Sequence, residues 1–130
     1  MNLFLTFNSQ EERRRYGGSA FLEFQYCRLP AEAETREKTS IFSLKLWRND
    51  SLYVRDDDVF LREYGNIFDC GVYNNGKRGT VDVNGINYYE PSLIDSIVEK
   101  IRKEKPMDCE SILTWLEEAK NYNGFYILGM

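Results

Sequence analysis

The sequence predicts an α+β domain, in which an antiparallel, meander-rich β-sheet carries two C-terminal helices packed on one face. Up to residue 89, apolar and polar residues alternate in short runs that are separated by turn residues. From residue 90 the apolar residues instead recur with the period of a helix. The 130 residues fit one domain, and no linker-like stretch divides them.

The first half of the chain supplies five strand candidates: Asn2–Phe7, Ser19–Cys27, Ile41–Trp47, Leu52–Val54 and Val59–Tyr64. The last three, joined by turn-forming residues 48–51 and by an aspartate cluster, predict a β-meander over residues 41–64. Charged residues 8–18 predict a turn or a short helix. Residues 29–40 predict a loop with a helical turn.

Turn signals also organise residues 70–89. Asn84-Gly85, between "TVDV" and "INYY", is typical of a two-residue type I′ hairpin, and Asn75-Gly76 marks a second turn. Within "INYY", Tyr88 and Tyr89 would point to opposite faces of a strand, so we expect at most one of them to be in the core.

Two amphipathic helices follow. Residues 90–105 carry Pro91 in the first turn and basic residues in the last turn, and both features suit a helix. Asp108 is positioned to cap a second helix over residues 109–120. Residues 125–129 predict a short terminal strand or an apolar tail.

Composition excludes several kinds of site. The chain contains no histidine, which excludes Ser-His-Asp and Cys-His catalysis. The widely spaced Cys27, Cys70 and Cys109 favour neither a zinc site nor a disulfide framework, and indicate a reducing compartment. The short apolar N-terminus is too short for a signal peptide, and no run reaches membrane-spanning length. We therefore expect a cytoplasmic protein without membrane contact.

The net charge of −4 is unevenly distributed. Residues 1–48 sum to +2 and residues 49–130 to −6. An acidic second half disfavours nucleic acid as a partner and permits a basic protein.

The aspartate cluster Asp56, Asp57 and Asp58 has three interpretations. It can be a solvated turn at the end of a strand, a carboxylate metal site, or a surface for a basic partner with aromatic side chains beside it. The metal interpretation would combine Asp58 with Glu63 and Asp82 in a metal-dependent hydrolase or nuclease, completed by Lys77. The partner interpretation uses the neighbouring tyrosines.

The segment "IFSLKLWRNDSLYVRDDDVFLREY", residues 41–64, resembles part of some small immunity proteins of bacterial contact-dependent growth inhibition systems. The matching pieces are an aromatic-rich strand "FSLKLW", a charged turn "RND", the strand "LYV", the polar "RDDD" and then "VFLREY". The N-terminal strands and the "INYYEP" stretch depart from that pattern.

The resemblance implies a protein that is not an enzyme and needs no metal or cofactor. Such proteins bind the C-terminal toxin domain of a large secreted protein in the cytoplasm and block its active site. The toxin is often a basic nuclease. Our expected partner contacts are Asp56, Asp57, Asp58, Tyr53, Tyr64, Asp82 and Tyr89. The alternatives are the carboxylate-based hydrolase and a non-catalytic subunit of a larger assembly.

Overall fold

The computed structural model describes residues 2–16, 22–40, 44 and 47–129. In chain order the elements are β1 (Phe4–Leu5), α1 (Gln10–Tyr16), β2 (Glu23–Tyr26), α2 (Thr35–Lys38), β3 (Leu52–Val54), α3 (Asp57–Tyr64), β4 (Gly71–Val72), β5 (Arg78–Gly79), β6 (Ile86–Tyr89), η2 (Pro91–Leu93), α4 (Ile94–Glu104), α5 (Cys109–Ala119) and β7 (Phe125–Leu128).

The described strands form one seven-stranded sheet in the order β1-β3-β2-β7-β6-β4-β5, and all of its pairs are antiparallel. The predicted α+β class is confirmed. The last strand of the chain lies in the middle of the sheet, where Phe125–Leu128 pairs with β2 on one side and β6 on the other. The C-terminal apolar stretch is therefore a central strand and not a tail.

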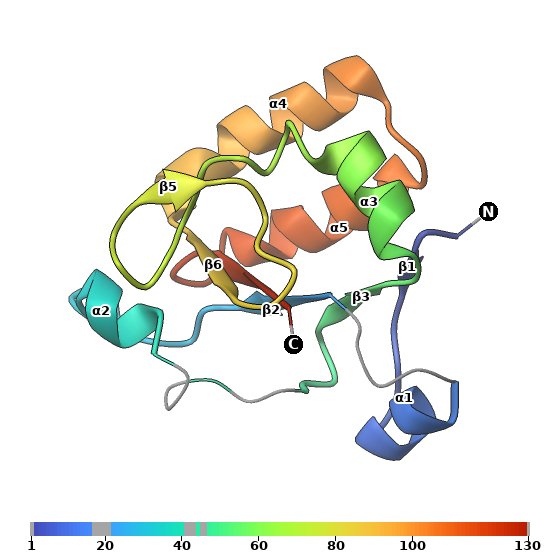
Figure 1. The fold of residues 1–130 in the computed structure, drawn as a ribbon, viewed down its shortest axis with the longest axis horizontal. Coiled ribbons are helices and arrows are strands. Elements are labelled where there is room, and N and C mark those ends of the chain that lie inside the picture. The colour runs from blue at the N-terminus through green and yellow to red at the C-terminus, as the bar shows by residue number, and fades with distance from the viewer. Residues whose placement is uncertain (1, 17–21, 41–43, 45–46, 130) are drawn as a thin grey trace.

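Helices α3, α4 and α5 lie on one side of the sheet and α1 lies on the other (Figure 1). The alternation of β2 explains why one face is apolar, since Phe24 and Tyr26 point toward α3–α5 while Glu23 and Gln25 point away. In this core, aromatic rings of the sheet pack against aromatic rings of the helices. The ring centroid of Phe24 lies 5.7 Å from that of Phe60 in α3 and 5.7 Å from that of Trp115 in α5.

The second face of the sheet is also covered. One cluster there contains Cys27, Tyr88, Tyr126 and Leu128, and another contains Phe7 and Tyr53. This corrects our expectation for the tyrosine pair of β6. Tyr88 and Tyr89 do point to opposite faces, but both are buried because both faces are covered.

The largest error of the sequence prediction concerns residues 57–64, which form helix α3 and not a strand. Asp56 caps this helix, because its side chain accepts a hydrogen bond from the backbone N–H of Val59 at 3.1 Å. Phe60 and Tyr64, one turn apart, are the buried residues of the helix and stack at 5.4 Å. Strand β3 pairs with β1 and β2 on its two sides, so it is not the middle strand of the predicted meander over residues 41–64. The predicted strand over residues 41–47 lies largely outside the described residues.

Of the two turn predictions, the turn at Asn75-Gly76 is confirmed and the hairpin at Asn84-Gly85 needs correction. Strands β4 and β5 pair around the turn at Asn75-Gly76, and Gly76 has a positive φ of 84°. Residues 80–83 form no strand, and neither Asn84 nor Gly85 has the positive φ of a type I′ turn. The type I′ hairpin at Asn84-Gly85 is therefore wrong.

Both C-terminal helices are confirmed, and Asp108 occupies the position before the second one, but the predicted cap by its side chain is not formed. Its side chain makes no capping bond to the backbone of α5. One carboxylate oxygen accepts a hydrogen bond from the Ser111 hydroxyl at 2.7 Å. The other accepts hydrogen bonds from the backbone N–H groups of Leu3 and Phe4, at 3.0 Å each. Asp108 thus ties the N-terminal strand to the α4–α5 connection.

Candidate partner-binding surface

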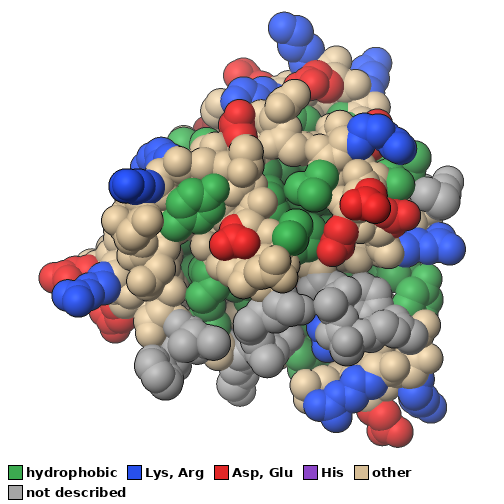
Figure 2. Space-filling view, in the orientation of Figure 1, with side chains coloured by type: hydrophobic (Ala, Val, Ile, Leu, Met, Phe, Trp, Pro, Cys, Tyr) green, Lys and Arg blue, Asp and Glu red, His purple; other side chains and the backbone are tan. Residues whose placement is uncertain are grey.

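The start of α3 gathers the aspartate cluster at the surface. Asp56 and Asp58 are exposed and Asp57 is half-buried. Acidic side chains suit this position, because the N-terminal turn of a helix carries a partial positive charge. Figure 2 shows acidic side chains gathered over α3. The cluster does follow the end of β3, as predicted, but it begins a helix and is not a break between two strands.

The carboxylates of this cluster affect one another electrostatically. The pKa of Asp57 is raised above its ordinary value, first by partial burial and then by the charges of Asp56 and Asp58. A hydrogen bond from the backbone of Leu22 acts in the opposite direction. Among the described residues, no Lys or Arg forms an ion pair with any of the three carboxylates.

Asp82 lies elsewhere, in the turn between β5 and β6. Its carboxylate accepts a hydrogen bond from the backbone N–H of Asn84 at 2.9 Å. Its own backbone N–H donates a hydrogen bond to the side-chain oxygen of Asn87 at 2.8 Å. A side chain at Gly85 would clash with the Asp82 carboxylate. Within the described part of the chain, no hydrogen bond or ion pair joins Asp82 to the aspartates of α3. Its local bonds give it a structural role in the turn.

The three tyrosines expected to contact a partner are wholly buried in the structure. Tyr53, Tyr64 and Tyr89 each have an exposed fraction of 0%. Their hydroxyls donate to backbone carbonyls, from Tyr64 to Met107 and from Tyr89 to Phe68 at 2.7 Å each, and from Tyr53 to Arg48 at 3.4 Å. Burial raises the pKa of all three phenols. These rings stabilise the core and do not form a binding surface.

The carboxylates of the alternative metal site do not assemble either. Glu63 accepts a hydrogen bond from the backbone N–H of Met107 at 2.9 Å, which joins α3 to the α4–α5 connection. Over the described ranges of the chain, no group of three or more Asp, Glu, Cys or His side chains could hold a metal ion. The combination of Asp58, Glu63 and Asp82 therefore has no geometric support.

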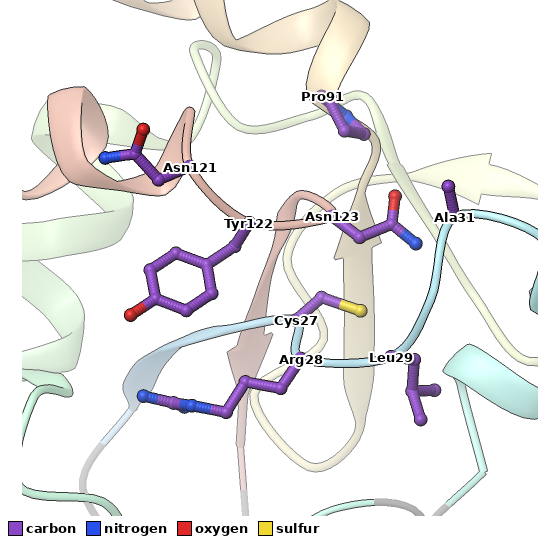
Figure 3. Close-up of a pocket in the computed structure, with 8 residues that line it drawn as sticks. All are labelled: Cys27, Arg28, Leu29, Ala31, Pro91, Asn121, Tyr122 and Asn123. Atoms are coloured by element: carbon purple, nitrogen blue, oxygen red, sulfur yellow. The ribbon is translucent and has the colours of Figure 1, made fainter.

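Sequence reasoning missed a pocket of about 400 Å³ beside the end of α5, shown in Figure 3. It is lined by Cys27, Arg28, Leu29, Ala31, Pro91, Asn121, Tyr122 and Asn123. The connection after α5 is held in place by the backbone, because the N–H of Asn123 donates to the carbonyl of Cys27 at 3.1 Å. The polar-aromatic run "NYNG", residues 121–124, is the only local sequence signal for it.

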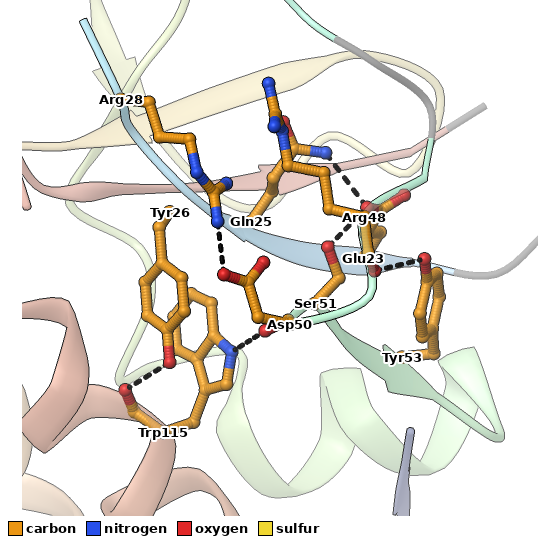
Figure 4. A network of polar contacts seen from close by, with 9 residues as sticks. All are labelled: Glu23, Gln25, Tyr26, Arg28, Arg48, Asp50, Ser51, Tyr53 and Trp115. Carbon is orange, nitrogen blue, oxygen red and sulfur yellow. Dashed lines mark hydrogen bonds and ion pairs between the residues drawn. The ribbon is translucent and has the colours of Figure 1, made fainter. Parts of the chain in front are cut away.

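The wall of this pocket rests on stacked rings. The Tyr26 ring is stacked between the rings of Trp115 and Tyr122, and the ring planes are nearly parallel in both pairs. The distances between ring centroids are 4.1 Å to Trp115 and 4.5 Å to Tyr122. The Arg28 guanidinium lies 5.3 Å from the Tyr122 ring centroid and forms an ion pair with Asp50 (Figure 4). Tyr and Arg are common contact residues at protein interfaces, so this rim offers a second surface of that kind.

A further groove of about 550 Å³ lies where α4 and α5 approach each other. It is lined by Arg102, Lys105, Cys109, Glu110, Leu113, Thr114 and Glu117. Arg102 and Glu117 are 3.9 Å apart, so the charges of this groove partly compensate each other. It selects for neither an anionic nor a cationic ligand.

Comparison with known proteins identifies no relative: no family model, no curated protein sequence and no solved structure matches this chain. No helix in the described ranges is both long enough and apolar enough to cross a bilayer.

Proposed function

We propose that this chain is an immunity protein that binds a cognate toxin domain, a basic nuclease, in the cytoplasm and covers its active site. In this role the chain performs no catalysis and needs no metal or cofactor. The resemblance of residues 41–64 to immunity proteins of contact-dependent growth inhibition systems motivates the proposal.

The observation that carries the proposal is the state of the aspartates at the start of α3. Three adjacent carboxylates lie at the surface without a cationic partner among the described residues, and Asp57 has a raised pKa. A basic surface placed against them would relieve their mutual repulsion. It would also accelerate association, since complementary charges steer partners together. The net charge of −4 acts in the same direction.

Apolar contact area is available on the same helix. Val59 and Leu61 of α3 are half-buried, so part of each side chain reaches the surface beside the acids. Because Tyr53, Tyr64 and Tyr89 are buried, we propose that α3 itself, with Asp57 and Asp58, forms the contact surface in place of the tyrosines.

A growth assay tests the function directly. The C-terminal domain encoded by the gene immediately upstream is induced in cells with and without this protein. We expect killing by the domain alone and rescue when both are expressed. A toxic domain whose effect persists in the presence of this protein would contradict immunity toward that domain.

A binding assay with charge variants tests the surface once a toxin is identified. The double variant Asp57→Asn/Asp58→Asn removes two charges but retains Asp56, which the helix needs as its cap. We expect the association rate at low salt to fall about tenfold and its salt dependence to weaken. The matched control is Glu99→Gln/Glu104→Gln on α4, where both residues are exposed. An equal loss in both double variants would show a net-charge effect and overturn the proposed surface.

A further inference from the structure

The pocket beside the end of α5 has a flat aromatic wall. Tyr26 covers one face of the Tyr122 ring and is itself supported by Trp115 on its other side. Tyr122 lines the pocket, and Figure 3 shows its ring nearly face-on among the lining side chains. Among the described residues, no second aromatic ring is stacked on Tyr122. The ring therefore offers a stacking surface to a planar ligand.

Hydrogen bonds hold the two chain segments that form this pocket together. The backbone N–H of Cys27 donates to the carbonyl of Gly124 at 3.0 Å, and the Asn123 side chain donates to the carbonyl of Pro30 at 2.9 Å. The Tyr88 hydroxyl donates to the backbone carbonyl of Asn123 at 2.7 Å. The wall is thus in place before a ligand arrives, and such preorganisation lowers the entropic cost of binding.

Two polar side chains that line the pocket can bind the edge of a ring. The Arg28 guanidinium donates one N–H to Asp50, and its remaining N–H groups have no hydrogen-bond partner within the described ranges. The Asn123 amide donates to Pro30, whereas its side-chain oxygen accepts no hydrogen bond from the part of the chain that the structure describes. Together they offer donors and an acceptor, and the edge of a nucleobase presents both kinds of group.

The charge of the lining favours a neutral ligand. Of the described residues that line the pocket, Arg28 alone is charged, and its ion pair with Asp50 compensates that charge. The lining therefore attracts neither a cation nor an anion strongly. The net charge of −4 also opposes a ligand that carries phosphate groups.

We propose that this pocket binds a neutral purine nucleoside, whose base stacks on Tyr122 and whose edge contacts Arg28 and Asn123. The volume of about 400 Å³ lies within the range of small-molecule sites, and a concave site suits a small molecule more than a flat protein surface. The two fused rings of a purine can cover a tyrosine ring, as bases do on aromatic side chains. No residue of α3 lines the pocket, so the proposal does not depend on the immunity function.

Isothermal titration calorimetry of the full chain with adenosine tests the proposal. For a ligand of this size we expect a Kd on the order of 0.1 mM. Absence of saturable binding at about ten times that concentration would overturn the proposal.

Two phosphate-bearing probes test the neutral character of the ligand. Adenosine monophosphate should bind within about twofold of adenosine, because the charge of Arg28 is already compensated. A single-stranded oligoadenylate should bind no more tightly than adenosine, since its backbone is repelled by the acidic protein. Binding of either probe about tenfold tighter than adenosine would indicate a phosphate or nucleic-acid site and overturn the assignment.

Variants of Tyr122 assign binding to its ring. Tyr122→Ala should weaken adenosine binding about tenfold, as expected for the loss of one aromatic stacking partner, and Tyr122→Phe should retain most of the affinity. Tyr16→Ala is the control, because it removes a ring that is 49% exposed and lies outside the pocket. Unchanged binding in a folded Tyr122→Ala protein would overturn the proposal, and so would an equal loss in Tyr16→Ala.

A blocking variant decides the proposal even if Tyr122→Ala does not fold. Ala31 lines the pocket and is exposed, so Ala31→Trp places a large side chain in the pocket and leaves the stacked rings intact. Glu32→Trp is the matched control, since Glu32 is exposed in the same turn and does not line the pocket. We expect Ala31→Trp to abolish adenosine binding and Glu32→Trp to preserve it. Equal affinity of the two variants would overturn the proposal.

Discussion

At the scale of single residues, burial decides which polar side chains influence stability. Glu23 and Tyr64 are both buried, but the first carries a carboxyl group and the second a phenol hydroxyl. A phenol loses little when its hydroxyl finds a carbonyl, as that of Tyr64 does at Met107. A carboxylate must either remain protonated or hold a charge away from water, so its ionisation becomes coupled to folding.

This coupling gives a pH dependence of global stability. Glu23 has a folded-state pKa of about 7 against an ordinary 4.5, so the folded chain binds the proton more tightly than the unfolded chain. Its contribution to the free energy of unfolding therefore decreases as pH rises from about 4.5 to about 7, by on the order of 3 kcal/mol.

The measurement is chemical denaturation across that pH range for the unchanged protein and for Glu23→Gln, in which position 23 no longer titrates. The difference between the two stability curves should slope downward with pH and level off above about pH 7. Parallel curves would contradict the raised pKa.

A second prediction at this scale concerns the buried tyrosines. Tyr64→Phe retains the ring but removes the hydroxyl and leaves the carbonyl of Met107 without this donor. We expect a loss of about 1 kcal/mol in the free energy of unfolding. Affinity for a toxin should not change, because the ring is not at the surface. A loss of affinity without a loss of stability would show that Tyr64 contacts the partner after all.

At the scale of elements, helix α3 depends on how it begins. Asp56 satisfies the backbone N–H of Val59, and the carboxylates that follow interact favourably with the helix dipole. Asp56 is therefore a cap, whereas Asp57 and Asp58 make no capping bond and belong to the proposed contact surface. The same three residues thus combine a structural role with the proposed electrostatic one.

Replacement of single aspartates separates these roles. Asp56→Ala should lower the free energy of unfolding by about 1 kcal/mol, whereas Asp56→Ser, which can still accept the bond, should lower it by less. Asp58→Ala is the matched control and should change stability by about 0.5 kcal/mol or less. Urea denaturation measures all three. Equal effects of Asp56→Ala and Asp58→Ala would contradict the capping role.

At the scale of the whole molecule, aromatic rings join the sheet to its helices. Phe24 on β2 approaches rings of Phe4, Phe60, Phe68, Trp115 and Phe125, which belong to β1, α3, the segment after α3, α5 and β7. Its contacts therefore connect segments from both ends of the chain. Loss of this one ring should weaken the entire fold and not one element.

Phe24→Ala should accordingly cost about 3–5 kcal/mol, a large share of the stability of a domain of this size. The control is Tyr16→Ala, because Tyr16 is 49% exposed and its removal should cost much less. Thermal unfolding followed by circular dichroism compares the two. A small effect of Phe24→Ala would show that the ring network is not the centre of the core.

The sequence by itself determined the features that depend on local order. Residues 94–104 and 109–119 repeat their apolar positions with a helical period, so their helices were predictable. The strand Leu52–Val54 followed from local composition in the same way. Helix α3 also had a local signal, the cap at Asp56 followed by Phe60 and Tyr64 one turn apart, but its β-favouring residues concealed it.

Only the tertiary structure decided which side chains remain at the surface. Alternation along β6 placed Tyr88 and Tyr89 on opposite faces, but it could not show that both faces are covered. Glu23 likewise sits at a position that would be exposed on a one-sided sheet. Burial depends on segments distant in the sequence, and for that reason the aspartates of α3 remained a candidate surface while the tyrosines became part of the core.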